Sequence, residues 1–366
     1  MGIGVHKVAM AAPSDVSELE RLIAAGAVDP ATIVAFIGKT EGNGGANDFT
    51  RGFATLSYQL MLARHLGCTP EEVTRRIAFV WSGGCEGVLS PHATVFTRGP
   101  DGAPAGSGKR LALGIAGTRA FAPEEIGTMA VVEAVAEAVD RARREAGIAD
   151  PRDVHYVQVK GPLLTPAGLA DADRRGVALV TRDPNGSKAF ARGSTALGVA
   201  LGLGEVPASA VTQEAIATRM DLFSAVASTS AGGELKACEI LLFGNAEGAG
   251  GEFQIGHAVL EDAIDAGGVR AALADAGLPD AGGSPDTGRI AAVFAKAEAS
   301  PSGMIRGRRN TMLSDADINY ERHARAALGA VIASITGDPA IFVSGGTEHQ
   351  CAPGSAPIAA IVRARS

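Results

Sequence analysis

The sequence is poor in aromatic residues and cysteine, and it has no long apolar run. Aromatic side chains make up 4% of the 366 residues. The four cysteines form no CxxC pair and no zinc-ligand spacing, which argues against a disulfide framework and favours a reduced, cytoplasmic protein. No apolar stretch reaches the length that crosses a membrane. Hydrophobic residues still reach 46%, so the chain can bury a large core.

An excess of positive charge is also lacking. The formal net charge is -7, which gives no reason to expect nucleic acid or an anionic membrane as a partner. No HExxH, GxSxG, P-loop or GxGxxG pattern occurs in a convincing context. The glycine-rich stretch 42–45 lacks the Lys-Ser/Thr that follows in a phosphate-binding loop. The common motif-based enzyme classes are therefore not indicated.

What the chain does contain is one short phrase that occurs three times. Each copy reads Ser, a small residue, Gly, any residue, Glu, and each follows an apolar run typical of a strand. The copies are residues 82–86, 230–234 and 344–348. Small residues at a strand end let the backbone approach a ligand closely.

The phrase belongs to an internal repeat of more than 100 residues. Each unit contains a helix, a strand that ends at a lysine, a helix that carries an arginine, the strand before the serine, and a closing strand. In all three units the apolar strand starts six residues before its lysine, at Lys39, Lys160 and Lys296. The sequence therefore predicts an α/β protein of three similar domains, which are residues 1–103, 111–247 and 253–366, separated by glycine-rich linkers.

The repeated residues predict a shared site if the units pack around a pseudo-threefold axis. A single lysine at a strand end is ordinarily a solvated surface charge, with a pKa near 10.4 that makes it a poor base. Desolvation and neighbouring cations lower that pKa, and the amine can then take a proton from serine, as in known Ser-Lys pairs. Backbone N–H groups after each serine would bind a developing oxyanion, and arginines would grip carbonyl oxygens. Such a site suits a small, planar molecule with several carbonyls.

These residues closely resemble the cyanuric acid hydrolase and barbiturase family of ring-opening amidohydrolases. The resemblance covers essentially the whole chain. The matching stretches are residues 38–44, 47–51, 82–92, 160–165, 228–233, 296–298, 307–309 and 344–350. It implies three α/β repeat domains around a pseudo-threefold axis with a central β-barrel-like core, a Toblerone-type fold.

The resemblance also implies roles for the site residues. Ser230 is expected to be the nucleophile and Lys160 its base, an assignment that the repeated phrase alone does not decide. The expected substrate-binding residues are Lys39, Arg51, Ser82, Gly83, Arg192, Ala231, Lys296, Arg325, Ser344 and Gly345. For the third arginine, spacing to Ser344 favours Arg325 over Arg322.

A structural metal ion is a further expectation from the resemblance. Its side-chain ligand would be Glu298, and backbone oxygens would come from around Thr347, Gln350, Cys351, Ala352 and Ser355. Oxygen ligands suit Mg²⁺ or Ca²⁺. The family implies no organic cofactor and suggests a homotetramer.

The expected activity is opening of the s-triazine ring of cyanuric acid to carboxybiuret, which yields biuret and CO₂. Barbiturase, which converts barbiturate to ureidomalonate, is the alternative, because Trp81 before Ser82 and Gly45 look more like barbiturases. An alternative of another class is a non-catalytic binder of small cyclic imides. Such a protein would not need three intact Ser-Lys pairs.

Overall fold

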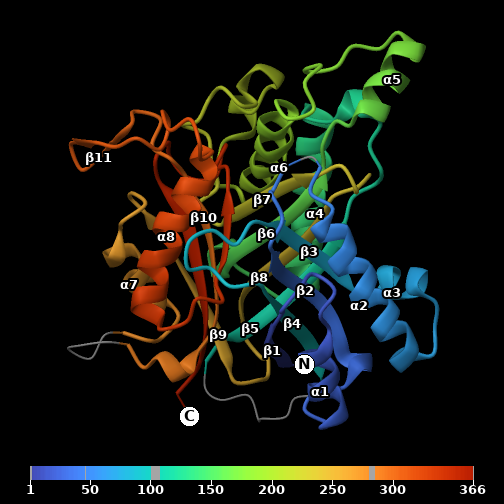
Figure 1. Cartoon of the computed structure of the whole chain (residues 1–366), viewed down its shortest axis with the longest axis vertical. Helices are drawn as coiled ribbons and strands as arrows, with labels where there is room; N and C mark the ends of the chain where they lie inside the picture. The colour runs from blue at the N-terminus through green and yellow to red at the C-terminus, as the bar shows by residue number, and fades with distance from the viewer. Residues whose placement is uncertain (1, 46, 100–107, 280–284, 366) are drawn as a thin grey trace.

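The strands form three four-stranded sheets with the same internal order (Figure 1). The computed structural model describes residues 2–45, 47–99, 108–279 and 285–365. The first sheet contains β1 (Gly2–Ala9), β4 (His92–Gly99), β2 (Ile33–Thr40) and β3 (Ala78–Gly83). The second contains β5 (Arg110–Gly117), β8 (Glu239–Ala246), β6 (Val154–Pro162) and β7 (Ala227–Gly232). The third contains β9 (Phe253–Leu260), β14 (Ala356–Arg363), β10 (Ile290–Ala297) and β13 (Phe342–Gly345).

The helices connect and cover these strands. They are α1 (Ser17–Ala24), α2 (Thr50–Leu66), α3 (Pro70–Arg76), α4 (Met129–Glu145), α5 (Pro166–Arg175), α6 (Ser187–Leu203), α7 (Ala266–Asp275) and α8 (Tyr320–Thr336). A short hairpin, β11 (Met304–Ile305) and β12 (Arg308–Arg309), projects from the third repeat (Figure 1). No helix of the described residues is long and apolar enough to cross a membrane.

The lysine strand lies parallel to the serine strand in every repeat. A parallel pair needs a crossover connection, which α2 (with α3), α6 and α8 supply. The predicted order of lysine strand, arginine helix, serine strand and closing strand is confirmed in all three repeats. The arginine helix of the second repeat begins at Ser187, five residues before Arg192.

Sequence analysis missed the strand that opens each repeat. β1, β5 and β9 pair antiparallel with the closing strands β4, β8 and β14. In the second repeat this strand directly follows the glycine-rich stretch that we interpreted as a linker. The predicted domain boundary at residue 103 and the chain ends 1 and 366 lie outside the described residues.

A shared apolar core joins the three sheets. Phe96, Phe243 and Phe294 each come from a different repeat, and their ring centroids lie 4.8, 6.4 and 6.4 Å apart. All three side chains are fully buried, and each contributes ~2–3 kcal/mol of burial free energy. The named strands of the described residues pair only within their own sheet. The expected barrel-like core therefore consists of three sheets that face one another and do not close into one hydrogen-bonded barrel.

Helices cover the outer faces of the sheets (Figure 1). In the second repeat, α4 buries Val131, Val135 and Val139 on the apolar side that faces the sheet. These residues recur every four positions, which places them on one side of a helix. The sheets are thereby fixed between the shared core and the helical layer, and the strand ends that carry the lysines and serines are held in place.

Candidate active site

Strand register places each predicted lysine directly opposite its predicted serine. The three register pairs are Lys39 with Ser82, Lys160 with Ser230, and Lys296 with Ser344. Side chains that are opposite each other on neighbouring strands project from the same face of a sheet. The repeat therefore builds three equivalent Ser-Lys corners, each at the end of a parallel strand pair.

One cavity gathers side chains from all three repeats. Its lining is Gly44, Arg51, Trp81, Ser82, Gly83, Lys160, Lys188, Arg192, Ser230, Ala231, Glu321, Arg325, Ser344 and Gly345. The remaining two predicted residues, Lys39 and Lys296, are fully buried beside their serines and do not reach the lining. The structure thus brings together the predicted serines, arginines and lysines at one place.

The three lysines make different contacts. Lys39 Nζ donates to Ser82 Oγ at 3.1 Å. Lys296 Nζ donates to two backbone carbonyls, at 2.8 and 2.9 Å. Lys160 Nζ and Ser230 Oγ are both buried and have no hydrogen-bond partner among the described residues. The second repeat therefore holds the one described pair in which neither the amine nor the hydroxyl has a hydrogen-bond partner.

Burial lowers the pKa of all three lysines. The pKa of Lys39 falls to about 7 because of burial and the nearby Arg325, and that of Lys296 falls to about 7 for the same kind of reason. The pKa of Lys160 falls to about 8 through burial and the charge of Arg51, against which a neighbouring carboxylate acts. An amine with such a pKa is partly neutral near physiological pH and can accept a proton.

The glutamate of the repeated phrase binds an arginine of another repeat. Glu86 accepts two hydrogen bonds from Arg325, at 2.8 and 2.6 Å. Glu348 accepts two from Arg192, both at 2.7 Å. Such bidentate pairs fix the guanidinium plane. Sequence analysis gave these glutamates no function, although the phrase itself contained the signal.

The third glutamate behaves differently. Glu234 Oε1 lies 3.7 Å from Arg51 Nε and 3.5 Å from Lys160 Nζ. Arg51 Nε is buried and has no hydrogen-bond partner among the described residues. The Ser230 corner is therefore the one where the arginine Nε has no hydrogen-bond partner among the described residues and the lysine has a carboxylate nearby.

Two further charged residues line the cavity and were not predicted. Glu321 lies at the start of α8, with its carboxylate 3.3 Å from Arg192 Nη1. Lys188, at the start of α6, has its pKa lowered by burial. Neither residue belongs to the repeated pattern, so the internal comparison of the three units offered no signal for them.

The structure separates the two candidates for the third arginine. The Arg325 side chain is 5% exposed and lines the cavity with Arg51 and Arg192. The Arg322 side chain is 40% exposed and approaches Glu86 only to 3.8 Å. Arg325 also occupies the sixth position of its helix, as Arg192 does in α6.

The residues expected around a metal ion lie in two adjoining loops, after β10 and after β13. The Glu298 carboxylate accepts a hydrogen bond from the Thr347 hydroxyl and is largely buried, which raises its pKa. The Gln350 side chain accepts from a backbone N–H at 2.7 Å, which leaves its backbone oxygen as the available ligand. Cys351 has a left-handed backbone with φ of 82°. A buried carboxylate beside an irregular loop of carbonyls fits a hard cation.

Comparison with known proteins places the chain in a family. A family model described as "Amidohydrolase ring-opening protein" matches residues 4–363. The chain belongs to this family. A relative from Azorhizobium caulinodans named "Cyclic amide hydrolase" is 72% identical over all of both chains. "Cyanuric acid amidohydrolase" from Bradyrhizobium diazoefficiens is 52% identical over 99% of this chain and 98% of its own. "Barbiturase 1" from a Nocardioides species is 44% identical over 98% of each.

Solved structures of the family confirm the predicted fold. One described as a cyanuric acid hydrolase superposes with a TM-score of 0.95 at 51% identity, and covers 99% of each chain. The cyanuric acid hydrolase of A. caulinodans superposes with a TM-score of 0.90 at 46% identity, over 100% of this chain and 99% of that one. The resemblance stated from the repeated residues is therefore confirmed along the full chain.

Proposed function

We propose that this chain is a cyanuric acid amidohydrolase, which opens the s-triazine ring by hydrolysis. The observation that carries the proposal is the set of three register-paired Lys-Ser corners, with three arginines, around one cavity. Cyanuric acid has three equivalent carbonyls, and each corner can hold one. The names of the relatives and of the superposed structures support this substrate class.

In the proposed mechanism, Lys160 and Ser230 carry out the chemistry. Neutral Lys160 takes the Ser230 hydroxyl proton while Oγ attacks a ring carbonyl carbon. The tetrahedral intermediate collapses, the C–N bond breaks, and the departing ring nitrogen takes the proton from Lys160. Water then gives a proton to Lys160 and attacks the acyl group, and the amine returns that proton to Ser230. Carboxybiuret leaves and loses CO₂ to give biuret.

The remaining residues bind and polarise the ring. Arg51 Nε, which is buried and has no hydrogen-bond partner among the described residues, stabilises the oxyanion at the Ser230 corner. Arg192 and Arg325, oriented by their glutamates, hold the other two carbonyls together with Ser344 and Ser82. Two corners therefore hold the ring while the third attacks it.

We also propose a structural Mg²⁺ or Ca²⁺ held by Glu298 and by carbonyl oxygens of the loop 347–355. The buried carboxylate supports this, because a buried charge without a cation is costly. The ion would fix the loop that follows Ser344 and would neutralise the carboxylate. It takes no part in the steps above.

Steady-state kinetics on cyanuric acid and barbituric acid test the substrate. We expect a higher kcat/KM on cyanuric acid. A specific observation keeps barbiturase as the second candidate, since Trp81 lines the cavity and a barbiturase is among the relatives. A higher kcat/KM on barbituric acid would instead make the chain a barbiturase. Binding without turnover of either ring would support a non-catalytic imide binder.

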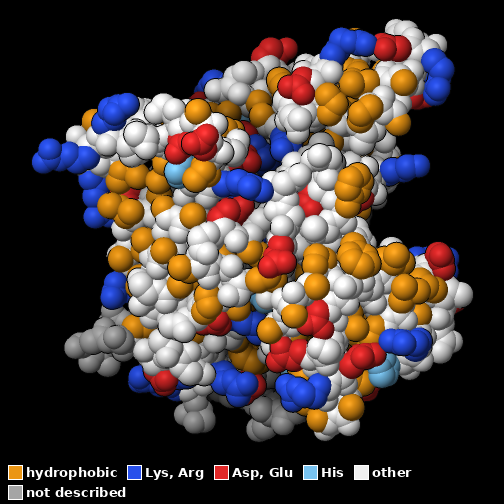
Figure 2. Space-filling view, viewed as in Figure 1, with side chains coloured by type: hydrophobic (Ala, Val, Ile, Leu, Met, Phe, Trp, Pro, Cys, Tyr) orange, Lys and Arg blue, Asp and Glu red, His pale blue; other side chains and the backbone are white. Residues whose placement is uncertain are grey.

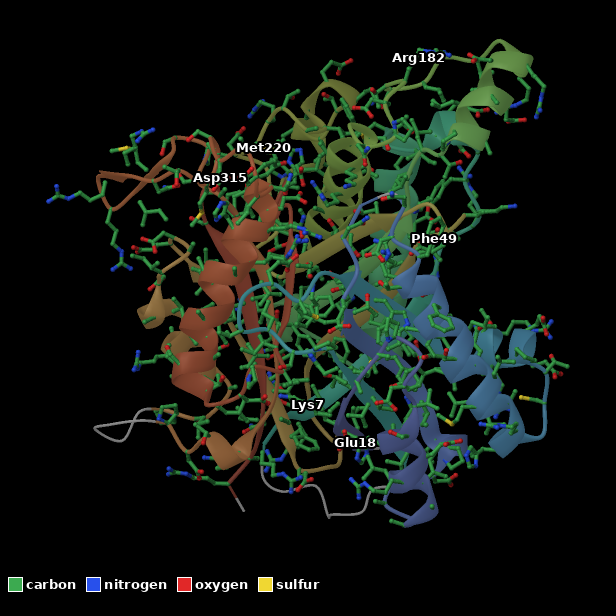
Figure 3. The ribbon with its side chains drawn as sticks, in the orientation of Figure 1. Lys7, Glu18, Phe49, Arg182, Met220 and Asp315 are labelled. Atoms are coloured by element: carbon green, nitrogen blue, oxygen red, sulfur yellow. The ribbon has the colours of Figure 1, made fainter. Side chains whose placement is uncertain are left out.

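We further propose a cytoplasmic homotetramer. All four cysteines are free thiols, as suits a reducing compartment. An apolar row of Phe49, Phe53, Leu56 and Leu60 lies exposed along α2, and Figure 2 shows hydrophobic side chains gathered over this helix. Phe49 begins the row and is 83% exposed (Figure 3). Light scattering after size exclusion tests the assembly, and a monomer would contradict it.

A further inference from the structure

A second cluster of chemically active side chains lies where the second and third repeats meet. It consists of His155 on β6, His257 on β9 and Asp275 at the end of α7 (elements labelled in Figure 1). The Nδ1 atoms of the two histidines lie 2.8 Å apart. Asp275 Oδ2 lies 3.3 Å from His155 Nδ1 and 3.7 Å from His257 Nδ1. Three atoms that bind metals well therefore converge on one point between the repeats.

This cluster is separate from the Ser-Lys cavity. His155 precedes Lys160 by five residues on the same extended strand. At about 3.3 Å per residue, the two side chains are attached roughly 16 Å apart. None of the three residues lines the cavity that holds Ser230. The cluster thus requires an explanation of its own.

The fold does not require histidine at either position. Counted back from the lysine of each strand, the first-repeat equivalent of His155 is Val34. Strand register makes Ile115 the second-repeat equivalent of His257, and Lys7 the first-repeat equivalent. Val34 and Ile115 pack against the shared apolar core. Lys7, labelled in the lower part of Figure 3, forms an ion pair with a different carboxylate. The imidazole pair is therefore particular to one place in the threefold repeat.

The carboxylate, in contrast, has a repeated structural function. The backbone N–H of His257 donates to Asp275 Oδ2 at 2.8 Å. In the second repeat, the N–H of Ile115 donates to Glu145 Oε2 at the same distance. Both carboxylates end a helix and bind the opening strand. In the third repeat this bond also fixes the carboxylate beside the imidazoles, as outer hydrogen bonds do for metal ligands.

We propose that His155, His257 and Asp275 bind a divalent transition-metal ion of the Zn²⁺ class, which clamps the second repeat to the third. A tetrahedral ion with bonds of ~2.0–2.1 Å needs ligand atoms ~3.3 Å apart, and the separations of 2.8, 3.3 and 3.7 Å bracket that value. Two imidazoles and one carboxylate suit Zn²⁺ better than Mg²⁺ or Ca²⁺. The Asp275 side chain is 45% exposed, so water can complete the coordination.

The test uses the full-length protein after removal of metal with a chelator. Mg²⁺ is then restored in excess to occupy the proposed oxygen-ligand site, and Zn²⁺ is titrated by calorimetry. Co²⁺ serves as a spectroscopic substitute, because a tetrahedral site with nitrogen ligands gives intense visible absorption. We expect one tight Zn²⁺ per chain, a tetrahedral Co²⁺ spectrum, and a higher Tm when Zn²⁺ is bound.

The matched variant is His155→Val with His257→Ile, which installs the residue types that the chain itself carries at Val34 and Ile115. This variant is expected to fold, to lose the Zn²⁺ stoichiometry and the Co²⁺ spectrum, and to show no Tm response to Zn²⁺. The control His65→Ala removes an exposed histidine of α2 and should bind Zn²⁺ as the natural chain does.

Asp275→Asn is the second variant, in case the double variant does not fold. Its amide oxygen can still accept the His257 N–H, while the anionic ligand is lost. We expect Zn²⁺ affinity to fall at least ~10-fold. Absence of stoichiometric Zn²⁺ binding by the natural chain, or unchanged binding in the double variant or in Asp275→Asn, would overturn the proposal. A histidine pair that only shares a proton would give the first of these results.

Discussion

The Glu234 carboxylate lies 3.5 Å from Lys160 Nζ, and no other glutamate of the repeated phrase forms a comparable contact with the lysine of its own repeat among the described ion pairs. Glu86 and Glu348 instead form bidentate pairs with arginines of other repeats. The threefold repeat is thus broken at one corner. That corner contains the one described lysine–serine pair in which neither side chain has a hydrogen-bond partner among the described residues.

The pH dependence of catalysis should report the Lys160 amine. Because the neutral amine must accept the serine proton, kcat/KM is expected to rise as pH increases through about 8, the pKa of Lys160. Glu234 raises this pKa, so Glu234→Gln should move the rising limb ~1 pH unit or more toward lower pH. A pH–rate profile of both proteins measures this. The control Glu86→Gln removes a carboxylate that contacts Arg325, and the rising limb of its pH–rate profile should stay near its original pH. If Glu234→Gln leaves the rising limb unmoved, that result would count against Lys160 as the base.

Lys160 should also reduce stability at neutral pH. Its pKa falls from 10.5 unfolded to about 8 folded, so below pH 8 the folded state carries the full cost of a buried ammonium, ~3 kcal/mol. That cost fades as pH rises from 8 to 10.5, because the folded protein loses the proton first. Lys160→Met is therefore expected to raise the free energy of unfolding at pH 7 and to lose that advantage above pH 10.5.

Urea denaturation at the two pH values measures the effect. The control Lys236→Met replaces an exposed lysine, and it should change stability by less than ~0.5 kcal/mol. A destabilised Lys160→Met protein at pH 7 would contradict the account.

The Ser-Lys pairs could be predicted from the sequence because three equivalent marks recur at the ends of similar strands. In the structure, strand register places each lysine directly opposite its serine, as with Lys160 opposite Ser230. The partners of the glutamates could not be predicted, because each one binds an arginine more than 150 positions away in another repeat, as in the Glu348–Arg192 pair. Which repeats contact each other depends on how the three sheets pack, and the sequence pattern within a single repeat does not predict that packing.

The opening strand of each repeat illustrates a different limit. β5 reads as alternating apolar and small residues, and it directly follows a segment rich in Gly, Pro and Ser. Its strand state depends on antiparallel pairing with β8, which is more than 120 residues distant. Long-range pairing of this kind overrides local preference. Lys188 and Glu321 were missed for another reason: each lies four residues before the arginine of its helix, but one is a lysine and the other a glutamate, so the repeats share no residue type there.

Variants of Arg325 and Arg322 provide a matched comparison that tests substrate binding. Arg325 lines the cavity, whereas Arg322 is the more exposed side chain. Arg325→Ala is expected to raise KM for cyanuric acid ~100-fold, about the contribution of a charge-assisted bond from a buried group. Arg322→Ala should change KM less than ~3-fold. Equal effects in steady-state kinetics would show that the buried arginine is not the selective contact.

Metal removal should affect stability more than chemistry. Chelation is expected to lower the Tm by at least ~2 °C, and Mg²⁺ or Ca²⁺ should restore it, since an ion that binds only the folded state stabilises it. Glu298→Gln should remove that response in calorimetric scans while kcat changes little. Loss of kcat with an unchanged Tm would show instead that the ion acts in the reaction.

The most direct test of the central claim compares three serine-to-alanine variants on cyanuric acid. The account predicts that Ser230→Ala lowers kcat ~10⁴-fold or more while the fold is kept, because it removes the attacking atom. Ser82→Ala and Ser344→Ala should keep kcat within ~100-fold and should mainly raise KM, since those serines hold carbonyls. Substantial turnover by Ser230→Ala, or a loss of comparable size in either of the other two, would contradict the assignment of Ser230 as the nucleophile.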